Sequence, residues 1–378
     1  MSGIRGGNFI DLGAVLKWSD CFKKISTEVY GPDDGKCGGY LYGSWLLRVF
    51  NFLGLNAEQT YFWGMVGGLF LAISLGLLAN LFLARERKNV LLVGIVFSSP
   101  GIWLLVERGN IDELIFILIL LACLLFIRGF EVPAILLIVV SALFKFYTAP
   151  LLILLAIIGS SRKTRIISLI FFVSVIPIVA FDYFRIEAQF PNTWFVSFGT
   201  PAIGFWVNLF GEKFGIERMH LDAAIGHISG LTILALSTVF VRKFAKSQEN
   251  TYSDATLSKN YSFLVDNILV IFGSVFVVCY VLGMNYDYRL IFAAVSGIAL
   301  ILRNPESPIN LILKVSLIIS LWFSSFSFGV KNDPSIETVT LFVLIQFVGD
   351  IALGIFASYL CLEITRILIQ RVRANADV

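Results

Sequence analysis

Charged and amide side chains interrupt an apolar region of the chain at IWLLVERGNIDELIFILILL. The stretch holds Glu107, Arg108, Asn110, Asp112 and Glu113 between two runs that could lie in lipid. Ionisable groups at membrane depth are candidates for function, and pairing with one another is the structural alternative. A carboxylate can accept a proton from a hydroxyl, and a cation can hold a phosphate. Each of these charges could also be an ordinary loop residue in water.

More ionisable residues occur at positions that the same reasoning places near the outer ends of apolar runs. Lys145 lies inside the apolar stretch SALFKFYTAP, DYFR occupies 182–185, and NYDYR at 285–289 contains Asp287 and Arg289. In a cavity at the edge of the bilayer, cations could hold a leaving phosphate while a carboxylate accepts the proton of an attacking hydroxyl. This combination therefore suits a lipid-linked phosphate.

Asp11 begins the polar N-terminal part of the chain. The spacing of Leu12, Val15 and Leu16 predicts an amphipathic helix that lies on the membrane and ends near Tyr30. Asp11 would lie in its first turn, where the helix dipole favours a carboxylate. The simpler interpretation of Asp11 alone is a helix cap.

The composition indicates which kind of secondary structure positions these residues. The chain has 378 residues, of which 57% are hydrophobic and 15% charged. We therefore expect an all-α, polytopic integral membrane protein with about 10–11 transmembrane or re-entrant helices. The net charge of +3 comes without a basic stripe, which argues against a nucleic-acid partner. No phosphate-binding glycine motif, Cys/His metal spacing or nucleophile elbow is found in the sequence.

Apolar runs place the individual spans. The segment 40–55 carries Arg48 in its middle and is typical of an interfacial or re-entrant helix. The run 132–159 is too long for one span and too short for two, which predicts two half-helices that meet near Lys145. The predicted spans are 60–84, 89–106, 113–128, 132–159, 166–184, 223–241, 263–283, 288–302, 308–328 and 338–365.

Lys and Arg are concentrated in one set of connections between these spans, which predicts that this set and the C-terminus are cytoplasmic. Residues 1–59 would then face outward, and Cys21 and Cys37 could form a disulfide there if that side is oxidising. The predicted parts are an outer amphipathic segment (1–59), a catalytic transmembrane module with the outer loop 185–222 (60–241), a cytoplasmic linker (242–262) and a C-terminal bundle (263–378).

Four stretches taken together are similar to a known class of enzymes. DLGAVLKWSDCFKKISTEVYGP, GYLYGSWLLRV, SSPGIWLLVERGNIDELIFILILLA and SALFKFYTAPLLILLAIIGSSRKTR resemble polyprenyl-phosphate-sugar-dependent membrane glycosyltransferases of GT-C architecture. The resemblance is strongest to the bacterial alpha-1,2-mannosyltransferase-like family and covers residues 9–165, with NYDYRLIF as a further match.

The resemblance implies a GT-C-like fold in the inner (plasma) membrane and an inverting glycosyl transfer on its outer face. A sugar, mannose or another hexose or pentose, would pass from a polyprenyl-phosphate donor to a hydroxyl of a glycan, glycolipid or protein acceptor. Asp11 would be the general base, and no cofactor is implied, although the carboxylates could hold a divalent cation. The residues implied to bind substrate are Glu107, Asn110, Asp112, Lys145, Tyr147, Asp287 and Arg289.

Two other function classes fit the same charged cavity. A transporter or flippase of a lipid-linked sugar or anion would use it without a catalytic base, but such proteins usually show an internal repeat, and none is convincing here. A non-catalytic subunit of a membrane complex would have ERGNIDE as a plain loop. Replacing Asp11 distinguishes an enzyme from both.

Overall fold

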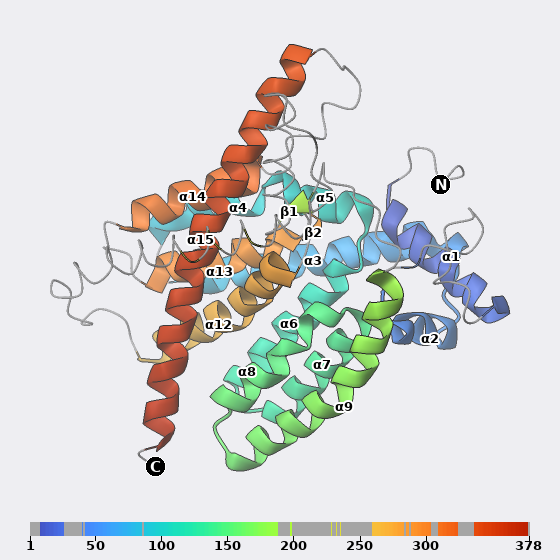
Figure 1. Cartoon of the computed structure of the whole chain (residues 1–378), viewed down its shortest axis with the longest axis horizontal. Coiled ribbons are helices and arrows are strands. Elements are labelled where there is room, and N and C mark those ends of the chain that lie inside the picture. Colours follow the sequence, from blue (N-terminus) through green and yellow to red (C-terminus); the bar gives the residue numbers. More distant parts are fainter. Residues whose placement is uncertain are drawn as a thin grey trace. The chain divides into compact units, whose positions relative to one another are not determined.

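The computed structural model of this chain is helical almost throughout its described residues (Figure 1). Those residues are 8–25, 40, 42–84, 87–187, 197–198, 259–282, 285–286, 289–303, 309–323 and 336–376, with the isolated positions 228, 232 and 235. The chain divides into two compact units, one formed by residues 1–78 and 103–192 and the other by 79–102 and 193–378. Each unit is discontinuous in sequence and has its own buried helices.

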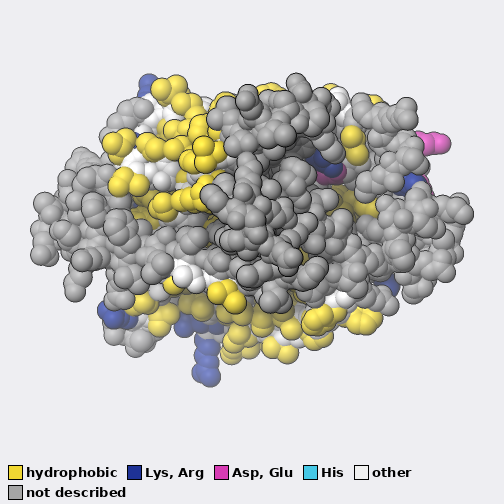
Figure 2. Space-filling model, turned by 45° about the horizontal axis from the view of Figure 1, so that its top comes forward, with side chains coloured by type: hydrophobic (Ala, Val, Ile, Leu, Met, Phe, Trp, Pro, Cys, Tyr) yellow, Lys and Arg dark blue, Asp and Glu magenta, His cyan; other side chains and the backbone are white. Residues whose placement is uncertain are grey.

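Membrane-length helices are present in both units. Four described helices are long and apolar enough to cross a membrane, at Ala57–Leu83, Arg162–Phe184, Tyr261–Val281 and Leu344–Arg373, and a bent pair of shorter helices makes five if the pair is one span. Hydrophobic side chains form much of the described surface in Figure 2, as expected where lipid replaces water around helices that satisfy their own backbone. The chain is an all-α protein with several membrane-length helices.

Only some of the predicted spans correspond to helices of membrane length. Several others correspond, within the described residues, to apolar helices of 10–17 residues, namely those within 131–158, 290–303 and 309–323. The predicted span at 223–241 and the predicted linker at 242–262 lie almost entirely outside the described residues.

The first unit is a layer of packed helices to which the N-terminal helix is attached. Helices α6 and α7, α7 and α9, and α8 and α9 pack side by side (Figure 1), while α1 packs on α2 and α2 on α7. The unit contains α1 (Ile10–Ile25), α2 (Ser44–Phe52), the 3₁₀ helix η2 (Ala57–Gln59), most of α3 (Thr60–Leu83) and α5 (Pro100–Arg108), α6 (Asp112–Ile127), α7 (Glu131–Phe144), the 3₁₀ helix η4 (Phe146–Thr148), α8 (Pro150–Ile158) and α9 (Arg162–Glu187).

The N-terminal helix α1 is held to α3 and α5 by its first residues. Its apolar face is buried at Val15 and Leu16, as the helical spacing predicts. Just before the helix, the Phe9 N–H donates to the Glu107 carbonyl at 2.7 Å, and Phe9 has a positive φ of 64°. A positive φ is uncommon for a bulky residue and persists only where the surroundings enforce it. The start of α1 is thus tightly fixed; its predicted end near Tyr30 lies outside the described residues.

The run 132–159 forms two helices, as predicted, with Lys145 at the break. Lys145 ends α7 with φ −142° and ψ 115°, which is extended backbone, and η4 and α8 follow. Pro150 occupies the start of α8, where its missing N–H costs no hydrogen bond. The break places a lysine side chain at the junction of two apolar helices.

The second unit has a more enclosed core. Every residue of α13 from Leu290 to Leu302 is buried, and Arg303 at its end bonds to Asp266 of α12 at 2.8 Å and to Glu363 of α15. These ion pairs connect the end of α13 to α12 and α15. The unit contains the 3₁₀ helix η3 (Arg87–Asn89), α4 (Val90–Phe97), α12 (Lys259–Leu282), α13 (Leu290–Arg303), α14 (Ile309–Phe323), α15 (Ile336–Ala376) and two paired strands, β1 (Ser197–Phe198) and β2 (Asn285–Tyr286).

Candidate functional site

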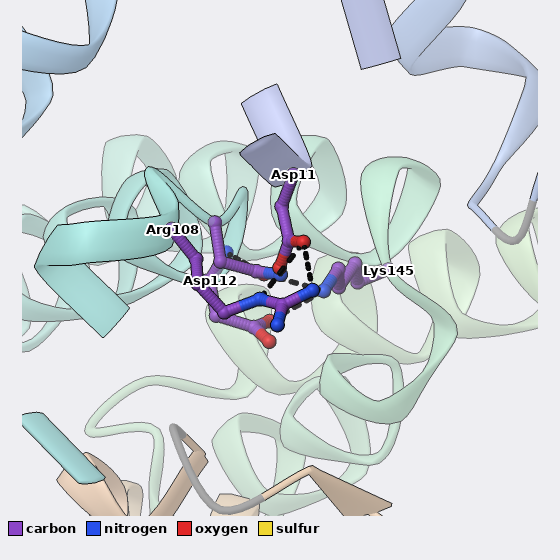
Figure 3. Close-up of polar contacts among 5 residues, drawn as sticks. Asp11, Arg108, Asp112 and Lys145 are labelled. Carbon is purple, nitrogen blue, oxygen red and sulfur yellow. Dashed lines mark hydrogen bonds and ion pairs between the residues drawn. The ribbon is translucent and has the colours of Figure 1, made fainter. Parts of the chain in front are cut away.

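Asp11 lies at one end of a polar cluster in the first unit. Arg108, the last residue of α5, donates to Asp11 Oδ1 from Nε at 2.9 Å and from Nη2 at 2.6 Å. Asn110 donates to the other oxygen, Oδ2, at 2.6 Å. Figure 3 shows the side chains of Asp11 and Arg108 pointing toward each other. Both carboxylate oxygens are therefore oriented by donors.

Lys145 and Asp112 form the other end of the cluster. Lys145 Nζ lies 2.8 Å from Asp112 Oδ1, and the Tyr147 hydroxyl donates to the same oxygen. The Lys145 and Asp112 side chains are 3% and 0% exposed, whereas those of Asp11 and Arg108 are 13% and 35% exposed. The Asp11–Arg108 end is thus accessible and the Lys145–Asp112 end is sealed.

Asn110 connects the two ends. Its Oδ1 accepts from Lys145 Nζ at 3.3 Å and from the backbone N–H of Asp112 at 3.0 Å, while its Nδ2 reaches Asp11. An amide has both donor and acceptor atoms, so it can join an anion and a cation without a charge of its own. Asn110 is 2% exposed, and the N–H that it accepts belongs to the first residue of α6.

The turn between α5 and α6 aims these residues at α1. Gly109 has a φ of +58°, a conformation that favours glycine. A Cβ on Gly109 would lie 3.0 Å from the Phe9 ring, so the glycine also allows the start of α1 to approach closely. The ERGNIDE stretch therefore contains a tight turn from which Arg108 and Asn110 reach Asp11 of α1.

A second close approach fixes Lys145 and brings Tyr42 beside it. The Gly43 N–H donates to the Phe144 carbonyl at 3.0 Å, and a Cβ on Gly43 would lie 2.1 Å from the Leu143 carbonyl oxygen. Lys145 Nζ lies 4.5 Å from the centre of the Tyr42 ring, within cation–π range. A residue of GYLYG is thereby part of the cluster.

A disulfide and an aromatic cluster support the loop that carries Tyr42. Cys21 of α1 is disulfide-bonded, and it packs with Tyr40 and Leu47, against which Trp18 and Tyr42 also lie. The predicted partner Cys37 lies outside the described residues. Cys123, Cys279 and Cys361 do not form disulfides, and the first two are buried.

The cluster brings together most of the predicted site residues. Asp11, Asn110, Asp112, Lys145 and Tyr147 form one network. Glu107 does not join it among the described interactions: its side chain is exposed, and only its carbonyl is used, by Phe9. Asp287 lies outside the described residues, and Arg289 belongs to the second unit.

Two members of the cluster were not assigned a role from the sequence. From the sequence, Arg108 can equally be a loop charge, and Tyr42 has no predicted role, because neither spacing nor hydropathy predicts which residues of GYLYG approach Lys145. The alternation Tyr-Leu-Tyr before Gly43 is a weak signal that one tyrosine faces inward.

Among the described residues the network contains two ion pairs, Asp11 with Arg108 and Asp112 with Lys145. Within the described part of the chain no three potential His, Cys, Asp or Glu ligands converge on a metal position. The accessible carboxylate could accept a proton, and the accessible guanidinium could bind an anion. No protein-family model, curated protein or solved structure matches this chain.

Proposed function

We propose that this protein is a membrane glycosyltransferase that uses a polyprenyl-phosphate-linked sugar, with Asp11 as general base. The observation that carries the proposal is the polar network in which an accessible carboxylate, held by Arg108 and Asn110, lies next to a buried Lys145–Asp112 pair. A base needs access and a fixed orientation, and Asp11 has both. The sequence resemblance supplies the reaction class.

The reaction follows from the roles of these groups. Asp11 accepts the proton of an acceptor hydroxyl, the hydroxyl oxygen attacks the anomeric carbon, and the bond from that carbon to the phosphate oxygen breaks. The bonding electrons leave with the polyprenyl phosphate, and the configuration inverts. Arg108 is the accessible cation that would meet the phosphate first, since its side chain is 35% exposed.

Lys145 takes part only after an exchange of partners. It is 3% exposed and bonded to Asp112 and Asn110, so a phosphate must displace one of these acceptors to contact it. The exchange replaces one charge-assisted bond by another and keeps the buried ammonium paired. The proposed role of Lys145 as a phosphate ligand thus requires a small rearrangement of the network.

The outward orientation of α1 is part of the proposal and has independent support. Stable disulfides are typical of oxidising compartments, and Cys21 in α1 is disulfide-bonded. The same helix carries Asp11. We infer that the active site faces the outer side of the membrane, where a lipid-linked donor replaces nucleotide sugars.

The test compares two aspartates of the same helix. Membranes containing wild type, Asp11→Asn or Asp20→Asn are incubated with a panel of radiolabelled polyprenyl-phosphate sugars, and label in product is measured. Asp20 is the matched control because its carboxylate accepts from the Ala57 N–H and lies outside the network. We expect Asp11→Asn to lower transfer by about 10²–10⁴-fold, the usual contribution of a general base, with little effect of Asp20→Asn.

The outcomes separate the function classes. Full transfer by Asp11→Asn would refute the role of the base. No transfer by wild type with any sugar, together with export of a labelled lipid-linked sugar across vesicles, would favour a flippase and overturn the enzyme proposal. Equal losses in both variants would assign the effect to folding of α1.

A further inference from the structure

Glu113 is a buried acidic residue that the proposed reaction does not use. It follows Asp112 in the first turn of α6 and is 4% exposed. Its carboxyl oxygen Oε1 is enclosed by protein atoms and has no hydrogen-bond partner among the described residues. Asp112, by contrast, is bonded to Lys145 and Tyr147. Two adjacent acids of one helix turn therefore have opposite surroundings.

The other carboxyl oxygen of Glu113, Oε2, lies against Gly67 of α3. A Cβ on Gly67 would lie 2.7 Å from Oε2 of Glu113, a distance that real Cβ atoms essentially never show. At the next position, a Cβ on Gly68 would meet a methyl group of Val106 at 3.5 Å. Gly67 thus provides the space that the carboxyl group occupies between α3 and α6.

An ionised carboxylate in this position would lack compensation. A buried charge is strongly unfavourable unless a counter-charge or several hydrogen bonds stabilise it. The neighbouring cations of the network bond to other acids, Arg108 to Asp11 and Lys145 to Asp112, and none of the ion pairs found among the described residues includes Glu113. Because Oε1 is sealed, a hydrated cation has no path to it, whereas a proton requires no added volume.

We propose that Glu113 is a proton-binding site, in which the carboxyl group carries its proton at neutral pH inside the α3–α6 contact. Asp112 and Glu113 then form a charged acid and a neutral acid side by side, set apart by their surroundings. Loss of the proton leaves a carboxylate that must move away from Gly67 to reach water. Proton exchange is therefore coupled to opening of the α3–α6 contact, and this holds whether or not the protein transfers sugars.

Infrared difference spectroscopy on the purified full-length protein in lipid nanodiscs measures the proton directly. A protonated carboxyl has a C=O stretching band that an ionised carboxylate lacks. We expect Glu113→Gln to lose one such band at neutral pH, and Glu58→Gln, which changes an exposed glutamate of η2, to lose none. Loss of a carboxylate band in Glu113→Gln, with the C=O region unchanged, would overturn the proposal.

A double-mutant cycle, measured by melting temperature, tests the same contact if Glu113→Gln is poorly folded. Gly67→Ala places a methyl group against Oε2, so we expect it to lower the melting temperature and to shift the C=O band of the wild-type background. In a Glu113→Ala background the obstacle is gone, so the same substitution should leave the melting temperature unchanged or raise it. Equal losses in both backgrounds would show that the carboxyl group does not occupy this contact.

Discussion

Removing Lys145 should destabilise the first unit far more than removing Arg108, although each cation pairs with one aspartate. The Lys145 and Asp112 side chains are 3% and 0% exposed, so Lys145→Met leaves a carboxylate buried without its cation. Breaking one partner of a buried pair costs about 3–5 kcal/mol. The Arg108 side chain is 35% exposed, so water can replace it after Arg108→Met, and that loss should be about 1 kcal/mol or less.

The double variant separates the pair from the rest of the site. Asp112→Leu combined with Lys145→Met removes both charges at once, and such replacements of buried pairs are often neutral or stabilising. We therefore expect the double variant to regain much of the stability lost in Lys145→Met, less the hydrogen bond from Tyr147. Thermal unfolding in detergent, monitored by size-exclusion chromatography, ranks the stability of the four proteins. Equal losses for Lys145→Met and Arg108→Met, or a double variant no more stable than Lys145→Met, would refute the reasoning.

Three further substitutions test the contacts that hold the cluster. Cys21→Ser removes a disulfide and should cost about 2–4 kcal/mol, with a matching loss for wild type under a reducing agent in the same melting assay. Phe9→Ala removes a ring that is 7% exposed and should cost about 3–5 kcal/mol, seen as a lower yield of monodisperse protein. Gly43→Ala places a Cβ 2.1 Å from the Leu143 carbonyl oxygen and should cost about 1–3 kcal/mol, whereas Gly54→Ser, at an open turn, should show only the smaller strain of its positive φ.

The helical class and the polar cluster could be predicted from local sequence, but the partners within the cluster could not. Hydropathy is enough to place α3 and α9, because these helices are apolar and exposed on most sides. The break at Lys145 followed from a lysine and a proline in an apolar run. These signals depend on short windows of sequence.

Which side chains of the cluster pair with each other depends on contacts between segments that are far apart in the chain. Asp11 and Arg108 are 97 positions apart, and the orientation of Arg108 depends on the positive φ of Gly109 and on the approach of Phe9. One break was not predicted: the predicted span 89–106 consists of two short helices, α4 and α5, bent by 45° at a break, because hydropathy does not distinguish a broken apolar run from one straight helix. Tertiary packing decided both features.

The glycines of α3 give this helix two kinds of surface that a hydropathy profile treats as one. A Cβ on Gly64 would lie 2.3 Å from the Phe9 ring, and Gly67 faces Glu113. Elsewhere on α3, Phe62, Leu69 and Ile73 are exposed apolar residues. Random mutagenesis should therefore find most of the circumference permissive to any lipid-compatible residue and the face that contains Gly64 and Gly67 much less tolerant of larger side chains. Variant scores based on hydrophobicity would rate Gly64→Leu as harmless, yet that change would detach the segment that delivers Asp11.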